Sequence, residues 1–291
     1  MIKKFGKYSV EITHPDKFYF PKAKITKEEL VEYYIKVAPL MLPFLKNRPI
    51  SMQRFVEGIS QEGFYQKNAG EYFPDWIKTK AIQRKEDNKV VNYVVADNAA
   101  TLAYITNQGC ITPHVWLSRI DKLDYPDKII FDLDPAGKDF EFVKFTALEL
   151  KKILEKERLS TFVMTTGSKG LHVVIPIKRT HPFDKIREYA KTIAQELIDK
   201  YPNDFTLEVR KEKRTNKVFI DTIRNAYGQT GVAPYAVRAL PGAPVATPLT
   251  WDELKNVKSS QQYNLKNIEE RLQKMGDVWK SFWKSSKTLK V

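Results

Sequence analysis

Two carboxylates separated by one residue, Asp132 and Asp134, end the apolar segment Lys128-Ile-Ile-Phe-Asp-Leu-Asp. Residues i and i+2 of a strand point to the same face, so these two side chains would lie together while Phe131 and Leu133 face the other way. Neighbouring carboxylates repel each other, and a hard divalent cation such as Mg²⁺ or Mn²⁺ relieves the repulsion by binding their oxygens. The spacing therefore favours a metal site.

A third carboxylate, Asp221, ends another apolar segment, Val218-Phe-Ile-Asp. Three acids on adjacent strands are what two-metal phosphoryl transfer needs, because one metal lowers the pKa of the attacking hydroxyl and the other stabilises the leaving pyrophosphate. We therefore predict that Asp132, Asp134 and Asp221 are catalytic and bind two Mn²⁺ or Mg²⁺ ions.

Two other interpretations of Asp132-Leu-Asp134 stay open at this point. A metal-dependent phosphatase of the haloacid-dehalogenase type also has an apolar strand that ends in Asp-x-Asp, where the first Asp is a nucleophile. That motif usually lies near the N-terminus and continues with a small residue and Thr or Val, whereas here it lies mid-chain and continues Pro135-Ala136-Gly137. The second interpretation is that the pair caps the following helix or holds surface cations.

The segment Gly167-Ser168-Lys169-Gly170 predicts a tight turn between two apolar strands. Glycines allow positive φ and let backbone N–H groups converge on an anion, and Ser168 and Lys169 add a hydroxyl and a charge. His172 follows on the next strand, on the face opposite Leu171. An ordinary hairpin turn and a hydrogen-bonded core histidine are the alternatives.

The composition indicates a soluble protein with a polyanionic partner. The formal net charge of +14 attracts phosphates, although the excess of lysine is also consistent with a merely solvated surface. The single cysteine, Cys110, excludes an intramolecular disulfide and suits a small buried apolar position. We find no signal peptide and no run of the ~20 apolar residues that a membrane span needs, and so expect a cytoplasmic location without membrane contact.

The remaining pattern predicts an α+β fold with a mixed sheet. Thr26 and Glu29 form a capping box that begins a helix to Leu45, and Thr250 begins another with Glu253. Further helices are expected over residues 140–159 and 183–201, and strands around 50–54, 63–66, 90–95, 114–117, 128–134, 161–166, 171–177 and 217–221. The irregular stretch 232–248 carries Arg238 and is expected to lie over the active site. The tail 255–291, with Trp279 and Trp283 at helical spacing, is expected to be a packing helix with a frayed end.

Three segments together resemble the archaeo-eukaryotic primase superfamily, and most closely the polymerase domain of bacterial and archaeal end-joining ligase D. They are Ile129-Ile-Phe-Asp-Leu-Asp-Pro135, Thr166-Gly-Ser-Lys-Gly-Leu-His172 and Lys217-Val-Phe-Ile-Asp221. The likeness runs from about His14 to Leu254 and includes Pro113-His-Val-Trp116 and Pro234-Tyr-Ala-Val-Arg238. It implies a primase-polymerase fold in which mixed and antiparallel sheets form a central cleft flanked by helices.

The resemblance also implies a function and a set of contacts. The protein would be a template-dependent polymerase that adds nucleotides, preferably ribonucleotides and with Mn²⁺ better than Mg²⁺, to a 3′-hydroxyl at DNA gaps or breaks. Its partners would be DNA with a gap, overhang or 5′-phosphate, nucleoside triphosphates, a DNA-end-binding protein and a DNA ligase, and we expect a monomer. The implied nucleotide-binding residues are His114, Ser168, Lys169, His172, Arg214 and Arg238. The implied DNA-binding residues are Lys17, Lys27, Arg54, Phe64, Tyr65 and Lys67.

Residues 1–291 would then form one primase-polymerase catalytic domain. Its expected parts are a DNA-end-binding part over about 1–100, a catalytic core over about 101–250 and a helical tail over about 250–291. The chain carries no ligase or phosphoesterase segment, so a free-standing relative and a domain of a longer protein both remain possible. So does a non-catalytic DNA-end-binding module that has kept the fold.

Two residue pairs raise specific expectations. Lys17 and Lys27 would bind a 5′-phosphate on the downstream strand together with free N–H groups of the helix that begins near Thr26, although two solvated lysines are the alternative. Phe64 and Tyr65 would stack on template bases. In a regular strand adjacent residues face opposite ways, so at least one would be in the core, and stacking would need a loop or a strand end; the adjacent Gln66, Lys67 and Asn68 favour an exposed position.

The sequence also departs from the family pattern. Asp221 is followed by Thr222-Ile-Arg224-Asn225, where the family often has Trp-Ser-Gln-Asn, and Arg224 in place of Gln leaves the local nucleotide contacts open. Phe64-Tyr65 stands where family members commonly carry Phe-Phe, and both pairs can stack.

Overall fold

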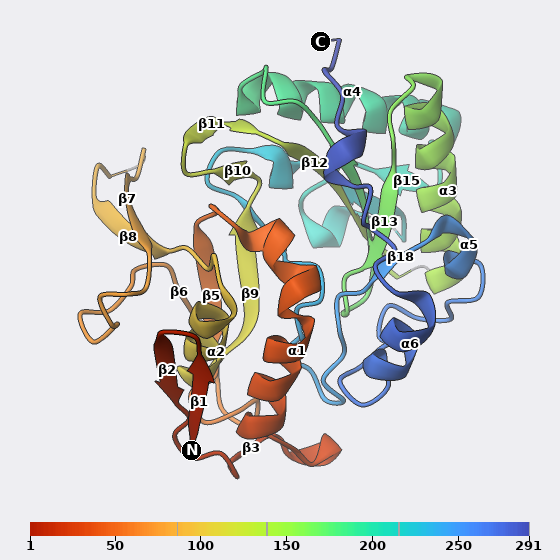
Figure 1. The fold of residues 1–291 in the computed structure, drawn as a ribbon. Helices are drawn as coiled ribbons and strands as arrows, with labels where there is room; N and C mark the ends of the chain where they lie inside the picture. Colours follow the sequence, from red (N-terminus) through yellow and green to blue (C-terminus); the bar gives the residue numbers. More distant parts are fainter. Residues whose placement is uncertain (86, 138, 215, 291) are drawn as a thin grey trace.

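The frame of the molecule consists of two six-stranded sheets (Figure 1). The structure is a computed structural model that describes residues 1–85, 87–137, 139–214 and 216–290. We call the first sheet the acidic sheet; its strand order is β15 (Phe205–Thr206), β16 (Val218–Asp221), β12 (Lys128–Asp134), β14 (Leu171–Pro176), β13 (Phe162–Thr165), β18 (Pro248–Leu249). Only the pairing of β15 with β16 is parallel. The acidic sheet is therefore mixed, as predicted.

The second sheet, here the platform sheet, is antiparallel throughout. Its order is β17 (Thr230–Val232), β9 (Cys110–Trp116), β5 (Ile50–Arg54), β8 (Val90–Val94), β7 (Thr79–Gln83), with β6 (Phe64–Gln66) also paired to β5. Cys110 is buried in it, as expected.

Two amphipathic helices cover one face of the acidic sheet. They are α3 (Phe140–Lys156), whose N-terminus is capped by the Asp139 side chain, and α4 (Phe183–Lys200). The residues spaced for one helical face in each of them pack in one core with Phe131 and Leu133 of β12. The helices predicted over 140–159 and 183–201 are thus confirmed within a few residues, and their apolar periodicity explains why they lie here.

The opposite face of β12 looks toward the platform sheet. Ile130 packs there in a second core with Val174, Ile50 and Val115, and helix α1 (Lys27–Leu45) closes the same core. Because the strand alternates, Asp132 and Asp134 continue the face of Ile130 beyond the point where apolar packing ends. The acids are in this way placed at the rim between the two sheets.

The N-terminal side of the molecule is made of shorter elements. The capping box of Thr26 and Glu29 is present at the start of α1. The other elements are β1 (Ile2–Phe5), β2 (Tyr8–Glu11), β3 (Phe18–Phe20), β4 (Ile25–Thr26), α2 (Ala99–Asn107), β10 (Ser118–Arg119) and β11 (Lys122–Pro126). Among the described residues, no helix has the length and apolar character that spanning a membrane requires.

The C-terminal tail differs from the expectation of one packing helix with a frayed end. Helix α5 (Trp251–Leu254) is short, and α6 (Ile268–Met275) ends at Gly276 with φ of +62°. Trp279 therefore lies beyond the helix, yet it is buried, and with Phe282 it packs against Phe44 and Phe162.

The last described residues are docked rather than frayed. The backbone N–H of Lys178 donates to the carbonyl of Lys287 at 2.8 Å, and Leu289 is buried. Lys287 of the tail thus forms an isolated parallel β-bridge with Ile177, the residue that follows β14.

Candidate active site

Strand register brings the acids and a histidine together. Asp132 on β12 lies directly opposite Asp221 on β16 and directly opposite His172 on β14. Directly opposed residues of antiparallel strands have Cβ atoms about 4.5–5.5 Å apart, so the three side chains share one small area of the sheet. Asp134 lies two residues further on β12, where the strand ends.

Each carboxylate has a nearby arginine. The Nε of Arg224, in the short helical turn Ile223–Asn225, lies 3.4 Å from Asp132 and 3.5 Å from Asp221. The Nη1 of Arg214 lies 3.2 Å from Asp134. His172 Nε2 is 3.6 Å from Asp132 Oδ1. Two guanidinium groups thus offset part of the negative charge of the three carboxylates.

The two central acids respond to this environment in opposite directions. Burial raises the pKa of the Asp132 carboxyl, but His172 and Arg224 outweigh burial and lower it to about 2. The pKa of Asp221 is raised, by burial first and then by the Asp132 charge, against the opposing effect of Arg224. Asp132 is therefore ionised over the whole physiological range. The raised pKa of Asp221 reflects its burial and its repulsion by the neighbouring Asp132 carboxylate.

These residues fit a divalent metal in part. As the side chains stand, no group of three histidine, cysteine or acidic residues among the described ones is close enough to hold a metal ion. Asp132 and Asp221 nevertheless form a carboxylate pair that shares one guanidinium, whose side chain is 40% exposed, and such a pair suits a hard cation. Asp134 would join the pair only by turning away from Arg214.

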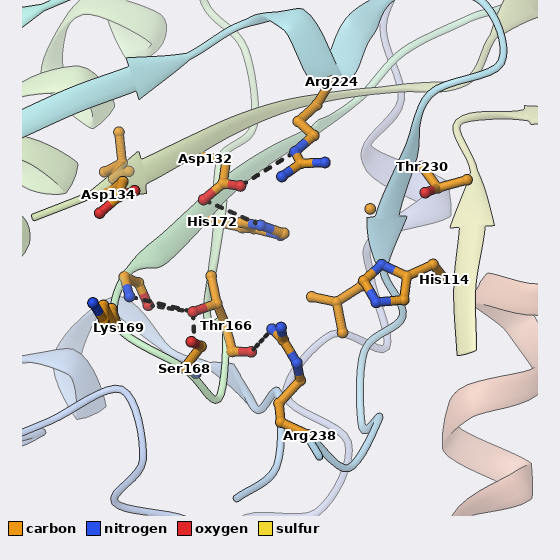
Figure 2. Close-up of a pocket in the computed structure, with 14 residues that line it drawn as sticks. His114, Asp132, Asp134, Thr166, Ser168, Lys169, His172, Arg224, Thr230 and Arg238 are labelled. Atoms are coloured by element: carbon orange, nitrogen blue, oxygen red, sulfur yellow. Dashed lines mark hydrogen bonds and ion pairs between the residues drawn. The ribbon is translucent and has the colours of Figure 1, made fainter. Parts of the chain in front are cut away.

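A cavity of about 180 Å³ opens beside the acids (Figure 2). It is lined by His114, Asp132, Leu133, Asp134, Thr166, Ser168, Lys169, Gly170, His172, Arg224, Thr230, Gly231, Val232 and Arg238. The structure therefore gathers two of the three predicted metal ligands, and every predicted nucleotide-binding residue except Arg214, around one space. Arg214 lies just behind, with its guanidinium bonded to Asp134 and to the carbonyls of Glu208 and Val209.

Two imidazole nitrogens at this cavity are buried without a partner, namely His114 Nε2 and His172 Nδ1. Burial, with Arg238 and Arg224 nearby, lowers the pKa of His114 to about 3, so its ring is neutral at physiological pH. Buried polar atoms in native proteins are normally hydrogen-bonded. These nitrogens are therefore groups that a bound ligand could satisfy.

The predicted phosphate-holding turn has a rigid backbone. Gly167 has φ of +66°, and a Cβ at Gly170 would lie 1.8 Å from the carbonyl oxygen of Leu133, so no larger residue fits there. The Thr166 hydroxyl accepts from the N–H groups of Ser168 and Gly170 at 3.3 Å each. Backbone N–H groups of the turn are thus directed inward to Thr166, and Ser168 and Lys169 offer their side chains to the cavity.

The loop over residues 232–248 reaches this turn. Arg238 Nη1 donates to the carbonyl of Thr166 at 2.7 Å, and Gly167 lies against Arg238 and Val245. The loop thus lies at the cavity, where the sequence predicted it. The hydrogen bond to Thr166 holds Arg238 beside the hairpin turn, and Figure 2 shows its guanidinium on the other side of His172 from Asp132.

Some lining residues have no role in the sequence-based prediction. Arg224 is a departure from the family pattern, and the sequence assigns no binding role to Thr166 or Thr230. The position of Arg224, three residues after Asp221, was the available signal, since one helical turn brings its side chain back over that carboxylate. Thr230 had no local signal, because the pairing of β17 with β9 places it here.

The candidate template platform, formed by Phe64 and Tyr65, is exposed. The side chains of Phe64 and Tyr65 are 49% and 57% exposed, as their polar neighbours indicate, although both residues lie in one strand. The reason is that β6 is a three-residue edge strand whose faces are both uncovered. Tyr65 also lies edge-on to His114, with ring centroids 5.6 Å apart, which connects the platform to the cavity.

Arg54, predicted to contact DNA, is buried beneath this platform. Its guanidinium lies 5.5 Å from the Phe64 ring centroid and donates to the Gln108 carbonyl at 2.7 Å and to the Tyr72 hydroxyl at 2.8 Å. Arg54 therefore supports the Phe64 ring. The side chain of Lys67, at the end of the same segment, is exposed and can bind a DNA phosphate.

The predicted 5′-phosphate residues, Lys17 and Lys27, lie apart from the cavity and together with Glu57 form a group that we call the lysine cluster. Lys17 Nζ lies 2.5 Å from Glu57, and Lys27 Nζ donates to the carbonyl and hydroxyl of Thr13 at 2.7 and 3.0 Å. Burial, and then the Lys17 charge, lowers the pKa of Lys27 to about 8.

The expected free N–H groups at the start of α1 are absent. The N–H of Lys27 donates to the Lys17 carbonyl at 2.8 Å and that of Glu28 to the Pro15 carbonyl at 3.1 Å. The third, of Glu29, is used by the capping box. That part of the prediction is wrong, because the preceding loop folds back over the helix N-terminus; only the ammonium groups can receive an anion.

Comparison with known proteins gives consistent matches. Residues 26–279 match the family model described as LigD, primase-polymerase domain. The chain is 31% identical over 280 residues to the multifunctional non-homologous end joining protein LigD of Pseudomonas aeruginosa, with 94% of this chain and 33% of that protein covered. The bifunctional LigD of Bacillus subtilis is 30% identical over 278 residues, with 95% and 44% covered.

The chain thus spans less than half the length of these curated relatives. Among solved structures, the polymerase domain of Mycobacterium tuberculosis ligase D in complex with DNA matches with a TM-score of 0.89 at 28% identity. That match covers 94% of this chain and 98% of the other. The α+β fold predicted from the sequence is confirmed by it.

Proposed function

The chain belongs to the LigD primase-polymerase domain family, and from that premise we propose that it is a DNA-dependent polymerase that extends a 3′-hydroxyl at gaps and breaks during end joining. The observation that carries the proposal is the cavity in which Asp132 and His172 face Lys169 and Arg238, with Asp221 directly opposite Asp132 on the adjacent strand. One wall of the cavity is acidic and the other is basic. A site that holds both metal cations and a triphosphate needs walls of both kinds. Membership of this family argues against the haloacid-dehalogenase reading.

The acidic wall would provide catalysis. The family uses divalent metal ions, and Asp132, Asp134 and Asp221 would hold two of them, Mn²⁺ or Mg²⁺. Such ions supply activation of the attacking hydroxyl and stabilisation of the leaving pyrophosphate. Asp132 and Asp221 are already aligned by register, while Asp134 must exchange its contact with Arg214. An ionised Asp132 suits this role because it needs no proton to be lost before it binds a cation.

The basic wall would bind the incoming nucleotide. Ser168, Lys169 and Arg238 face the cavity and could make charge-assisted hydrogen bonds to triphosphate oxygens. The neutral His114 and the unpartnered nitrogen of His172 add groups that recognise hydrogen-bonding atoms of the nucleotide. A preference for ribonucleotides and for Mn²⁺ is part of the proposal and rests on the family likeness.

The platform and the lysine cluster would bind DNA. Phe64 and Tyr65 present exposed rings on which template bases can stack, while Lys17 and Lys27 would bind the 5′-phosphate of the downstream strand. The structural relative in complex with DNA supports a nucleic-acid partner. The proposed organisation is a DNA-end-binding part over about 1–100, a catalytic core over about 101–250 and a tail over about 250–291.

The proposal also covers the setting in which the protein acts. It would act as a monomer in the cytoplasm, with a DNA-end-binding protein that presents the break and a DNA ligase that seals it. The relatives named for non-homologous end joining support this setting.

A primer-extension assay tests the proposed reaction. A gapped duplex is offered with each ribonucleotide and deoxyribonucleotide in turn, with Mn²⁺, Mg²⁺ or a chelator, and p-nitrophenyl phosphate is offered in parallel as a phosphatase substrate. We expect metal-dependent, template-directed extension that is faster with ribonucleotides and Mn²⁺. Hydrolysis of the ester without extension would reverse the assignment, and binding of DNA without either activity would make the chain a non-catalytic DNA-end-binding module.

A further inference from the structure

Glu57 belongs to the lysine cluster although it has the charge of the ligand. Its carboxylate lies 2.5 Å from Lys17 Nζ, which also lies 3.4 Å from the Val56 carbonyl. The charges of Lys17, His14 and Lys27 all act on Glu57 and lower its pKa, with the Lys17 hydrogen bond as the main cause. One acid therefore lies among the groups that would receive a 5′-phosphate.

The backbone holds Glu57 in this place. The turn that carries it is pressed against β3: a Cβ at Gly58 would lie 2.9 Å from the Phe18 carbonyl oxygen, and the N–H of Ile59 donates to the Tyr19 carbonyl at 2.9 Å. The φ of Gly58 is +78°, a conformation that favours glycine. Glu57 thus reaches Lys17 from a fixed turn, and only its side chain is free to leave.

The charges of the cluster are not balanced. Lys27 is buried and its ammonium donates to the two oxygen atoms of Thr13, both neutral. Among the described residues, Glu57 is the one acid that pairs with this cluster, through Lys17, so a single negative charge offsets the two ammonium groups. A terminal phosphate carries about −1.5 to −2 at neutral pH and matches the pair better than one carboxylate does.

We propose that Glu57 is an internal counterion that occupies the 5′-phosphate site and that the terminal phosphate of the downstream strand displaces. This inference rests on the proposed function, which places that phosphate at Lys17 and Lys27. The ion pair is exposed, with 58% of the Glu57 side chain accessible, and exposed pairs are weak. A doubly charged terminal phosphate therefore displaces the carboxylate at small cost.

Displacement has a consequence for selectivity. An internal phosphodiester carries a single negative charge. If it replaced Glu57, one monoanion would take the place of another, and the gain in binding free energy would be small. Glu57 thus keeps ordinary backbone phosphates out of the site while it lowers the affinity of a true 5′-phosphate end. If Glu57 instead served to position Lys17 for the phosphate, its removal would weaken binding, which is the opposite effect.

The test measures affinity for two gapped duplexes that differ only in a 5′-phosphate or 5′-hydroxyl on the downstream strand. Fluorescence anisotropy is recorded for the native chain, Glu57→Gln and Glu62→Gln. Glu62 is an exposed acid further along the same loop, so its variant carries the same change of net charge. We expect Glu57→Gln to bind the phosphorylated gap roughly two- to fivefold more tightly, as the removal of a competing surface ion pair allows. The gain for the hydroxyl gap should be smaller, and Glu62→Gln should change both gaps alike.

A second pair of variants tests whether the gain in affinity for the phosphorylated gap depends on the contact between Glu57 and Lys17. In the Lys17→Ala background, adding Glu57→Gln should give no further tightening for the phosphorylated gap, because the contact is already absent. Unchanged or weaker binding by Glu57→Gln, or a gain that persists without Lys17, would overturn the inference. If the native chain does not distinguish the two gaps, the 5′-phosphate site of the proposed function fails instead; primer extension is scored separately.

Discussion

The cavity around Asp132 and the lysine cluster are both charged sites, but the chain builds them in different ways. In the cavity, Arg224 and Asp132 meet although they are 92 residues apart, and register between strands fixes their positions. In the lysine cluster, backbone contacts of the loop before α1 and of the turn that carries Glu57 hold an exposed ion pair between residues 40 apart. The carboxylates of the first site are thus held by sheet register, whereas we infer that the second site exchanges its counterion.

The largest expected effect concerns the acidic wall. Asp132→Ala should lower single-turnover primer extension by about a thousandfold, because a metal ligand contributes several kcal/mol to the transition state. DNA affinity, including the preference for a 5′-phosphate, should stay near the native value. Asp199→Ala, an exposed acid on α4, is the matched control. Near-normal extension by the Asp132 variant would remove the catalytic assignment.

The basic wall should show the next largest effect. Lys169→Ala combined with Arg238→Ala should raise the apparent KM for the nucleotide by roughly ten- to a hundredfold, since each is expected to make charge-assisted hydrogen bonds to the triphosphate. DNA affinity should change much less. A thermal melt checks the fold, because Arg238 also bonds to Thr166. An unchanged KM would make the turn at 167–170 a structural hairpin only.

The platform lies between the two sites and should give a moderate effect. Phe64→Ala and Tyr65→Ala should each weaken binding of a template overhang by roughly tenfold, within the range of about 1–3 kcal/mol for one stacked base. Val90→Ala, at another exposed apolar position of the platform sheet, is the control. If neither aromatic substitution changed the affinity for the overhang, the template would have to bind elsewhere.

The smallest effect is a pH dependence of the lysine cluster. The pKa of Lys27 is lowered from 10.5 to about 8, so its ammonium is charged below that pH and loses its proton above it. The preference for a phosphorylated gap should therefore decline between pH 7.5 and 9.5, with a midpoint above 8 because the bound phosphate favours the charged form. Lys27→Met should show a weaker preference that does not vary over this range. A native preference that is constant with pH would exclude Lys27 from the site.

Unfolding does not account for such a decline. For a lysine whose folded-state pKa lies below its unfolded value, the unfolded chain binds more protons between about pH 8 and 10.5. Stability with respect to this group accordingly rises with pH in that interval. A circular dichroism melt at each pH provides the check.

Local patterns predicted the elements well. The capping box at Thr26 and the apolar spacing in residues 140–156 and 183–200 depend only on neighbours along the chain, and α1, α3 and α4 follow them. Alternation in β12 likewise placed Asp132 on the face opposite Phe131.

Features that depend on distant segments could not be predicted in the same way. The contact of Arg224 with both carboxylates requires the register of β12 and β16. The polar neighbours of Phe64 and Tyr65 indicate exposure, but the exposure of both rings within one strand follows from the place of β6 at a sheet edge. The occupied N–H groups of α1 result from a loop that folds back on the helix.

The docked tail has a practical consequence for anyone who shortens the chain. Phe44 and Phe162 are covered by Trp279 and Phe282, which lie beyond the last full helix. A version that stopped after α6 would keep every residue of the cavity but leave these rings facing water. Contiguous exposed apolar surface of this kind promotes self-association, so the shortened protein should precipitate or elute as aggregates even though its active site is complete.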